Sequence, residues 1–337
     1  MAGASRYGPG NKSARALDPA RRGRYRPAPM PTVPARSSSP GRYTKKTWLK
    51  IDGHPVASVE RYSGGDPYAE VINEPGGMLP YAKKHLGALH FADLEAQVSM
   101  DANPLLHHWI RDAWFGKASR DRVVLETIES SGTTTRGLQL AHPRLRNVTL
   151  PGLDVTSRER RYLALSIVFR GVQRIAGKTP AVQEREEREF RAQHFQIDLA
   201  GLDCSGVLQV DPISVQLELP AEGVRKASTL VFPDLHLHLD AEKADSFRAW
   251  FDDFVIAGNN DDDQERDGSI TYNEPFGGAL ATLRLFHAGI YRITDEPAIP
   301  PGPPRVRVDL YVERMEFARM DTESGSTEQG MAPIEVE

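Results

Sequence analysis

The chain has 337 residues, of which 39% are hydrophobic and 26% charged, and its formal net charge is −4. This balance is typical of a soluble globular protein, and no apolar run approaches the roughly 18–20 residues that cross a bilayer. A single cysteine, Cys204, excludes an intramolecular disulfide. We expect Cys204 to be a small packed residue in a strand-like stretch.

The first segment, residues 1–46, is basic and rich in Pro, Arg, Ser, Ala and Gly. It carries a charge of about +10, which leaves about −14 on the remainder of the chain. Because it has almost no aliphatic residues to bury, we predict a disordered arm. It lacks the apolar core of a secretory signal. A solvated tail is one interpretation, and an arm that contacts nucleic acid or an acidic partner is the other.

A patterned segment follows at residues 47–176. Alternating apolar residues predict short strands, and apolar residues at helical spacing around Trp109 predict one amphipathic helix. Pro75 begins a predicted loop that runs to about His85. The predicted strands are 48–51, 56–61, 69–73, 94–100, 123–128, 137–141, 148–150 and 163–169, and the helix is 104–116.

The second patterned segment, residues 194–320, repeats the first. Phe91, Asp93, Leu94 and Trp109 each have an identical residue 141 positions later, at Phe232, Asp234, Leu235 and Trp250. Other matches lie at offsets of up to 146 residues, so small loop insertions account for the drift and the sequence predicts a tandem duplication. We call residues 47–176 the first copy and residues 194–320 the second copy. Between them we predict a charged linker at 177–193, and after them a flexible tail at 321–337.

Each copy is predicted to contain several strands and one helix, the second helix spanning 242–257. The predicted fold class is mainly β with α, built as two tandem antiparallel β-sandwich or open-barrel domains with one flanking helix each.

Three polar residues share one face of the predicted strand at 235–240. His236, His238 and Asp240 are spaced so that all three side chains point the same way, which permits metal ligation. The opposite face carries three leucines, so the polar face is also explained as the outer face of the strand. The first copy has Asp93, Glu95 and Gln97 along its matching strand, so a metal would be peculiar to the second copy. His107 and His108 are expected to frame the polar border of the first helix.

Residues 263–274 resemble a calcium loop. Oxygen-bearing side chains stand at positions 1, 3, 5, 9 and 12, with glycine at position 6 and isoleucine at position 8. Against this interpretation, Glu265 is longer than the usual residue at position 3, and Pro275 follows where a second helix is needed. The alternative is an acidic turn in which Gly268 adopts a positive φ. The residues concerned are Asp263, Glu265, Asp267, Gly268, Ile270, Thr271 and Glu274.

Catalytic signatures are not found. Residues 171–179 approach a phosphate-binding loop, but five residues separate Gly171 from Gly177 and Pro180 follows Thr179 directly. The sequence contains no nucleophile elbow, paired-cysteine zinc site or dinucleotide glycine fingerprint. Because the repeated residues are core and turn residues, we expect a non-enzymatic protein without cofactor, catalytic or metal-binding residues.

Both copies resemble the tail-tube proteins of contractile-tailed phages and related contractile injection systems, over about 270 residues. In the first copy the resembling features are Leu49-Lys-Ile-Asp-Gly53, Glu74-Pro-Gly-Gly77 followed by Lys83-Lys-His-Leu-Gly87, Asn103-Pro-Leu-Leu-His-His-Trp109, and Leu153-Asp-Val155. Residues 250–260 and 265–268 look like the same family in a more divergent form.

The resemblance implies that each copy is a β-sandwich or barrel that joins its neighbours edge to edge, six domains closing a ring around a channel. This chain departs from the family by fusing two domains, so three chains could form a pseudo-sixfold ring, or six chains two stacked rings. A fused pair favours a tube initiator or baseplate-hub adaptor over the repeating tube. The implied partners are other copies of the chain, neighbouring tube or baseplate proteins and, through the basic arm, nucleic acid or an acidic channel. The implied location is a virion tail or injection particle assembled in the bacterial cytoplasm. The rival hypothesis is a two-domain β-sandwich that binds calcium or a carbohydrate.

Overall fold

The computed structural model describes residues 46–74, 81–116, 120, 122–128, 135–177, 188–218, 229–297, 302 and 304–319. The chain divides into two compact units, Met1–Arg42 and Tyr43–Glu337, and every described residue belongs to the second unit. The predicted arm up to residue 45, most of the linker and the C-terminal tail therefore lie outside the described residues. The described part is mainly β with few helices, and all the paired strands in it are antiparallel.

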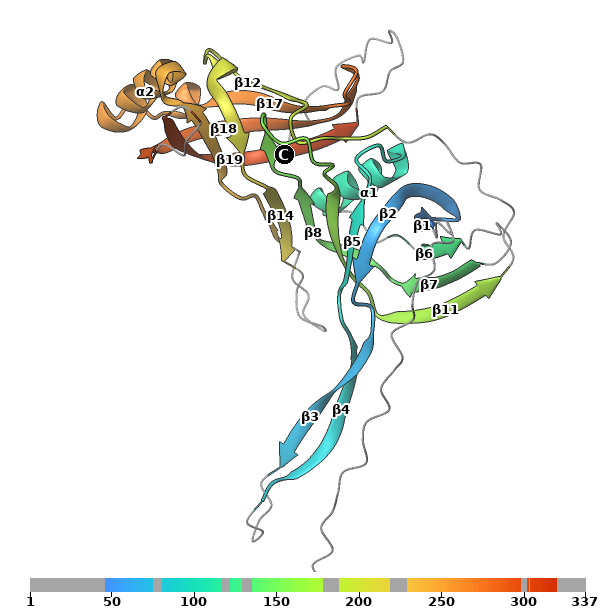
Figure 1. Ribbon diagram of the computed structural model, residues 1–337. Coiled ribbons are helices and arrows are strands. Elements are labelled where there is room, and N and C mark those ends of the chain that lie inside the picture. Colours follow the sequence, from blue (N-terminus) through green and yellow to red (C-terminus); the bar gives the residue numbers. More distant parts are fainter. Residues whose placement is uncertain are drawn as a thin grey trace, which may run out of the picture. The chain divides into compact units, whose positions relative to one another are not determined.

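The largest sheet has ten strands and is strongly curved at one end, as Figure 1 shows. Eight of its strands come from the first copy and two from the second. In spatial order they are β11 (Gly171–Gly177), β7 (Thr135–Ala141), β6 (Arg122–Ile128), β1 (Lys46–Ile51), β2 (His54–Ser63), β5 (Leu94–Val98), β10 (Leu163–Val168), β8 (Arg144–Leu150), β14 (Ile213–Glu218) and β15 (Thr229–Val231).

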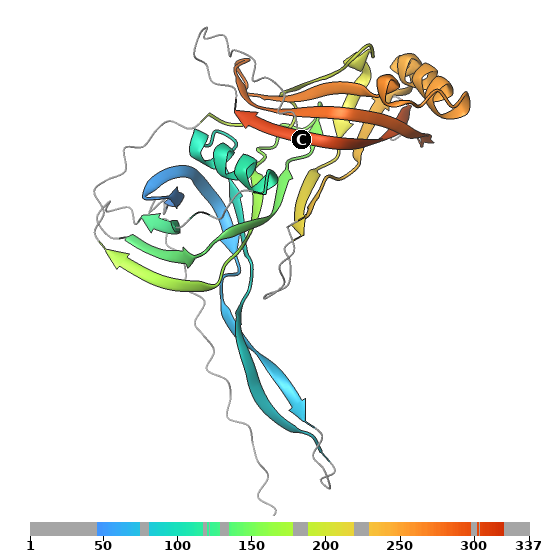
Figure 2. The ribbon, with the colours of Figure 1, turned by 180° about the vertical axis from the view of Figure 1, so that it is seen from behind.

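A second sheet of seven strands belongs to the second copy, except for one short strand of the first copy. Its order is β12 (Phe195–Leu199), β17 (Arg266–Asn273), β18 (Ala279–Glu296), β19 (Arg305–Arg319), β16 (Leu235–Asp240), β13 (Val207–Val210) and β9 (Leu153–Asp154). The third sheet is a separate hairpin of β3 (Pro67–Glu74) and β4 (Lys83–Phe91). Both ribbon views show this hairpin extending away from the ten-stranded sheet (Figures 1 and 2).

The helices match the prediction in place. Helix α1 (Pro104–Trp114) begins at Asn103, whose side chain accepts a hydrogen bond from the Leu105 N–H at 3.0 Å, and proline occupies its first turn. In the second copy, α2 (Asp245–Phe251) continues into a π-helical turn at Asp252–Ile256. Both helical segments end at a glycine with positive φ, Gly116 and Gly258. No helix among the described residues is long and apolar enough to cross a membrane.

Strand partners repeat between the copies, as the sequence duplication predicts. In the first copy β5 pairs with β10, joining Leu94 to Ile167 and Val98 to Leu163. In the second copy β16 pairs with β19 at the corresponding residues, joining Leu235 to Leu310 and Leu239 to Val306.

The ladders on the other side of β10 and β19 also match between the copies. Val148 faces Leu165 in the first copy, and Ile293 faces Val308 in the second. Each ladder contains a register shift next to these pairs. His142 and His287, which are 145 residues apart, both have positive φ, at 51° and 54°. The two copies therefore share these ladders, their register and an unusual backbone position, but β1 pairs with β2 whereas no ladder joins β12 to β13 in the described part of the chain.

The buried apolar residues of both copies form one continuous cluster, in which Trp109 and Trp250 are 1% and 4% exposed. The copies therefore share a core, which a reading of each copy alone does not predict.

Parts of two segments expected to be loops or turns are strands. Residues 83–85, at the end of the loop predicted from Pro75 to about His85, belong to β4 (Lys83–Phe91), and residues 266–273 of the calcium-loop-like segment form β17.

Candidate assembly surfaces

The two copies are joined by strand addition. Strand β14 of the second copy pairs with the outer edge of β8 in the first copy, from Ile213 opposite Leu150 to Gln216 opposite Asn147. Val148 and Val215 face each other and are each 1% exposed. One copy therefore extends the sheet of the other through backbone hydrogen bonds and a dry apolar contact.

Small neutral polar side chains complete this joint. Ser214 lies 2.9 Å from the Thr149 hydroxyl and donates to the Asn147 side-chain oxygen at 2.9 Å. These groups satisfy one another without any charge. A second strand exchange lies nearby, where β9 of the first copy pairs with β13 of the second.

The residues just before helix α1 add a polar contact to the joint. The Asp101 side chain, 1% exposed, accepts hydrogen bonds from the Arg188 backbone N–H and guanidinium, each at 3.1 Å. Arg319 of β19 lies 3.9 Å from the same carboxylate and donates to the Ala102 carbonyl at 3.1 Å. A buried carboxylate thus links the first copy to residues of the linker and of the second copy.

His107 is buried at the same joint. Its ring stacks at 5.1 Å on Phe317 of β19, and neither ring nitrogen has a hydrogen-bond partner among the described residues. Burial, reinforced by the positive charge of Arg319, lowers the pKa of His107 to about 4. His107 is therefore neutral at physiological pH, and it packs against the second copy instead of framing a polar border. Its neighbour His108 is exposed.

The edges of β18 and β2 are equivalent to the joined edges of β8 and β13. In the described part of the chain these two edges have no partner strand. Strand β17 pairs with β18 only as far as Ala288, so residues 289–296 of β18 have β19 on one side and no strand on the other. Likewise β1 pairs with β2 only as far as Val59, which leaves Arg61 and Tyr62 paired with β5 alone. Arg61 and Tyr62 correspond to Gln209 and Val210 of β13, the two residues that pair with β9.

The β3–β4 hairpin presents uncovered apolar side chains. Leu86 is 73% exposed and Leu89 is 64% exposed, and Tyr68, Val71 and Ile72 are also exposed. A two-stranded hairpin alone is at best marginally stable in water, and contiguous apolar surface of this kind marks an interaction site. At its base, Gly64 and Gly65 have φ of +82° and +80°.

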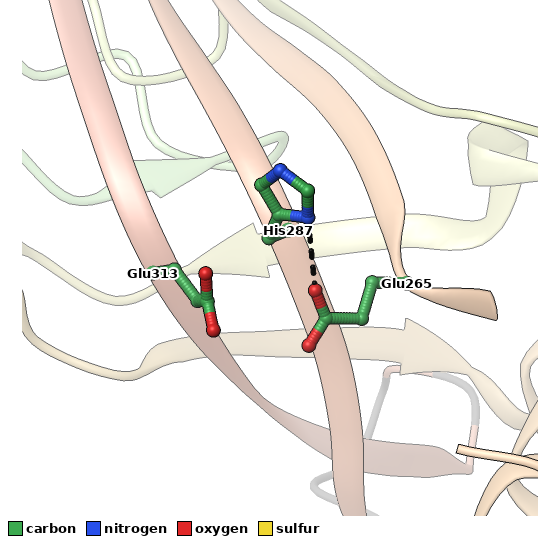
Figure 3. Close-up of side chains that lie close together, drawn as sticks. All are labelled: Glu265, His287 and Glu313. Carbon is green, nitrogen blue, oxygen red and sulfur yellow. Dashed lines mark hydrogen bonds and ion pairs between the residues drawn. The ribbon is translucent and has the colours of Figure 1, made fainter. Parts of the chain in front are cut away.

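A separate polar cluster lies on the second copy, as Figure 3 shows. Ligand atoms of Glu265, His287 and Glu313 lie within 4.8 Å of one another. Glu265 accepts hydrogen bonds from the Tyr311 hydroxyl at 2.6 Å and pairs with His287 Nδ1 at 3.0 Å, so each of its carboxylate oxygens already has a partner. Burial and the Glu265 hydrogen bond raise the pKa of Tyr311. Glu265, next to β17, thus contacts both β18, through the positive-φ residue His287, and β19, through Tyr311.

The predicted calcium loop is not formed. The extended strand β17, eight residues and about 25 Å long at a strand's rise, lies between Asp263 and Glu274. Asp267 accepts from the His287 backbone N–H, and Glu274 lies near Arg188. Gly268 has no positive φ; a Cβ there would overlap the Asp198 carbonyl of β12. The alternative of a positive-φ turn is therefore also wrong, because the glycine serves close strand packing.

The histidines of β16 are engaged by neighbouring acidic groups. His236 Nδ1 lies 2.7 Å from the fully buried Asp309, and His238 Nδ1 lies 2.9 Å from Glu296. Burial disfavours the charge on Asp309, but hydrogen bonds from Arg307, Arg292 and His236 outweigh it and hold the pKa of this carboxyl below its usual value. Asp240, the third predicted residue, caps the following turn through the Glu242 N–H at 3.0 Å. The three residues do not converge on one point.

The structure also locates Cys204 and the segment Gly171–Gly177. Cys204 lies in a 3-10 turn, Cys204–Gly206, and not in a strand; it is half-buried, and burial raises its thiol pKa. Gly171–Gly177 is strand β11, paired along its length with β7, and not a phosphate loop. Lys178 and Thr179 lie outside the described residues.

No family model matches this chain, and no curated protein matches it.

The residues that form the joint were mostly missed by sequence reasoning. Asn147, Ser214 and Asp101 carry no pattern that distinguishes them from other polar residues. The hairpin could have been found, because Tyr68, Val71, Ile72, Leu86 and Leu89 form two apolar runs around the glycines at 76–77. An apolar hairpin without a complementary strand in its own copy is the signal for a binding surface.

Proposed function

We propose that this protein is a structural, non-enzymatic component of a phage tail or contractile injection system. In this proposal it forms a tube layer, or a baseplate-hub or tube-initiator layer, as a trimeric or hexameric ring around a channel. In this proposal, the mainly β fold consists of two tube-like β-sandwich or open-barrel domains in tandem. It acts in a virion tail or injection particle assembled in the bacterial cytoplasm.

One observation carries the proposal: β14 of the second copy extends the sheet of the first copy at β8. Equivalent units that meet edge to edge within a chain can meet in the same way between chains. Strand edges without partners recruit further strands, and a rotation that closes turns such growth into a ring. The family resemblance of both copies supports the same arrangement. The partners are then other copies and neighbouring tube or baseplate proteins, with the basic arm a contact for nucleic acid or an acidic channel.

Sedimentation of the full chain over a range of concentrations, with negative-stain electron microscopy, tests this function. We expect discrete oligomers containing three or six chains and ring-shaped particles. A protein that remains monomeric up to high micromolar concentration would refute the proposal. Rings with neighbouring tube or baseplate proteins would place the chain within the particle.

A second candidate is a metal-binding module, favoured by the Glu265–His287–Glu313 cluster. Histidine with two carboxylates suits zinc better than calcium, because calcium prefers ligand sets made wholly of oxygen. Metal would have to displace the Tyr311 and His287 hydrogen bonds of Glu265, which opposes binding. Calorimetric titration with zinc and with calcium separates the candidates: heat with a stoichiometry of one, lost in His287→Ala, would support the module.

A further inference from the structure

The β3–β4 and β14–β15 hairpins occupy the same place in the two copies. Both connect the strand of the β2 type to the strand of the β5 type, and in the hairpins Tyr68 faces His90 as Gln216 faces Val231. Aligning the second strands through Phe91 and Phe232 makes Asp66 the counterpart of Ser214 and Tyr68 the counterpart of Gln216. One of these hairpins is seated on a neighbouring copy, and the other is not.

The edges that would receive the hairpins are also equivalent. Val148 of β8 and Ile293 of β18 face corresponding residues of β10 and β19. Residues 147–150, which receive β14, therefore correspond to residues 292–295. Val148 is 1% exposed beneath β14, whereas Ile293 is half-buried and Arg292, Thr294 and Asp295 are exposed. The second copy therefore exposes the edge that the first copy has covered.

We infer that the β3–β4 hairpin of one chain adds to the open edge of β18 in a second copy of this chain, with Asp66 opposite Thr294. The inference rests on the proposed self-assembly and names its contact. The occupant is another chain because β3 and β4 pair only with each other in the described part of the chain. The contact is head to tail, so it propagates in one direction and forms a ring when the rotation between chains closes.

Charge complementarity supports this pairing. Within the chain, Ser214 donates to Asn147; between chains, the same two positions would hold Asp66 and Arg292. The Arg292 Nε donates to buried Asp309, which orients the side chain, while 56% of that side chain is exposed. A neutral hydrogen bond within the chain is thus replaced by an oppositely charged pair between chains, which favours the correct partner and orientation.

The base of the β3–β4 hairpin differs in sequence from that of its counterpart in the second copy. Gly64 and Gly65 at its base adopt positive φ, and the position equivalent to Gly64 in the second copy is Pro212. The Asp66 carbonyl accepts from the Ala92 N–H, so the nitrogen of Pro67 lies on the edge away from β4, and the ladder opposite Ile293 has one backbone hydrogen bond fewer than the ladder of Val215 with Val148. Pairing with β18 also gives Tyr68 a neighbour and brings the exposed apolar residues Val71, Leu86 and Leu89 towards a second chain.

Disulfide mapping in a Cys204→Ser background tests the contact. Asp66→Cys and Thr294→Cys are placed in separate chains, mixed and oxidised mildly. We expect a reducible dimer that contains one chain of each kind. The double variant Thr149→Cys with Ser214→Cys is the matched control, and it should cross-link within a single chain. Ile293→Cys, one residue out of register and on the opposite face, should not react with Asp66→Cys.

Asp66→Arg gives a second readout that needs no cysteine. We expect it to weaken self-association about tenfold or more, because it sets like charges against Arg292. Glu70→Arg, in the same strand but beyond the predicted ladder, should change self-association less than twofold. Rings that form without the Asp66–Thr294 cross-link and tolerate Asp66→Arg would overturn this contact and leave the proposed function standing. A wild-type chain that never self-associates would overturn both.

Discussion

The two copies share the ladders of β5 with β10 and of β16 with β19 but differ at their edges. The first copy has its β8 edge covered by β14, and the residues there are small and neutral: Asn147, Thr149 and Ser214. The second copy leaves the equivalent edge of β18 open, and charged residues occupy it, including Arg292 and Asp295. Charged side chains on an open edge oppose indiscriminate pairing. Changes in a few edge residues therefore accompany a covered, neutral edge in one copy and an open, charged edge in the other.

The largest expected effect concerns the joint between the copies. Asp101→Ala removes the buried carboxylate that holds Arg188 and Arg319, and we expect a loss of about 3–5 kcal/mol in the free energy of unfolding, because a broken buried pair leaves charges unpaired. Urea denaturation measures it. Glu316→Ala, which removes an exposed ion pair with Arg314, should change stability by about 0.5 kcal/mol or less. Equal effects would show that Asp101 does not stabilise the joint.

Acid should weaken the same joint through His107. Its folded pKa of about 4 lies below the ordinary histidine value of 6.5, so the stability present above pH 6.5 is lost as the pH falls towards 4. The loss approaches about 3 kcal/mol at pH 4, since each pKa unit corresponds to about 1.36 kcal/mol. In His107→Leu the decline between these pH values should shrink by that amount, while exposed His108→Leu should decline like the wild type. Parallel stability curves for all three proteins would contradict this assignment.

The base of the free hairpin should be sensitive to a single methyl group. A Cβ at Gly64 would overlap the Asp93 carbonyl oxygen, and its φ is +82°. We expect Gly64→Ala to cost about 2 kcal/mol or more, because strained backbone adds to the overlap. Gly116→Ala has a similar φ but open space around the Cβ, and should cost about 1 kcal/mol. Thermal unfolding of both variants makes the comparison; an equal loss would mean that the close approach is relaxed in solution.

The smallest expected effect concerns the Glu265–His287–Glu313 cluster of the second copy. Tyr311→Phe removes the hydroxyl that donates to Glu265, and we expect a loss of about 1 kcal/mol. Tyr291→Phe removes an exposed hydrogen bond to Asp234 and should cost less. Denaturant midpoints decide between them. A stable Tyr311→Phe protein would show that Glu265 is satisfied without the phenol, as a metal ligand would be.

Patterns within one element predicted much of the fold. Alternation of Leu235, Leu237 and Leu239 predicted β16, and the repeated tryptophans located α1 and α2, because each signal depends on which face of a strand or helix is buried. The offsets then predicted matching strand partners, which the ladders of β5 with β10 and β16 with β19 confirm.

Contacts between elements were not predictable in the same way. Alternation does not say which strand pairs with which, so the exchange of β9 and β14 between the copies was missed. The oxygen spacing at 263–274 resembles a calcium loop because of its side-chain order, yet the pairing of β17 with β12 and β18 keeps this segment extended. Tertiary pairing overrides a local motif of this kind. The joint residues Asp101 and His107 are recognisable only once α1 lies against β19.

Hydrogen–deuterium exchange of the dilute and the assembled protein tests the central claim most directly. Residues 147–150 of β8 already have a partner in the chain, so their protection should be the same in both states. Those amides of residues 292–295 that do not already bond to β19 should exchange at least about tenfold more slowly once chains assemble, because β3 of the next chain covers their edge. Assembled rings in which residues 292–295 exchange as fast as in the monomer would contradict the account.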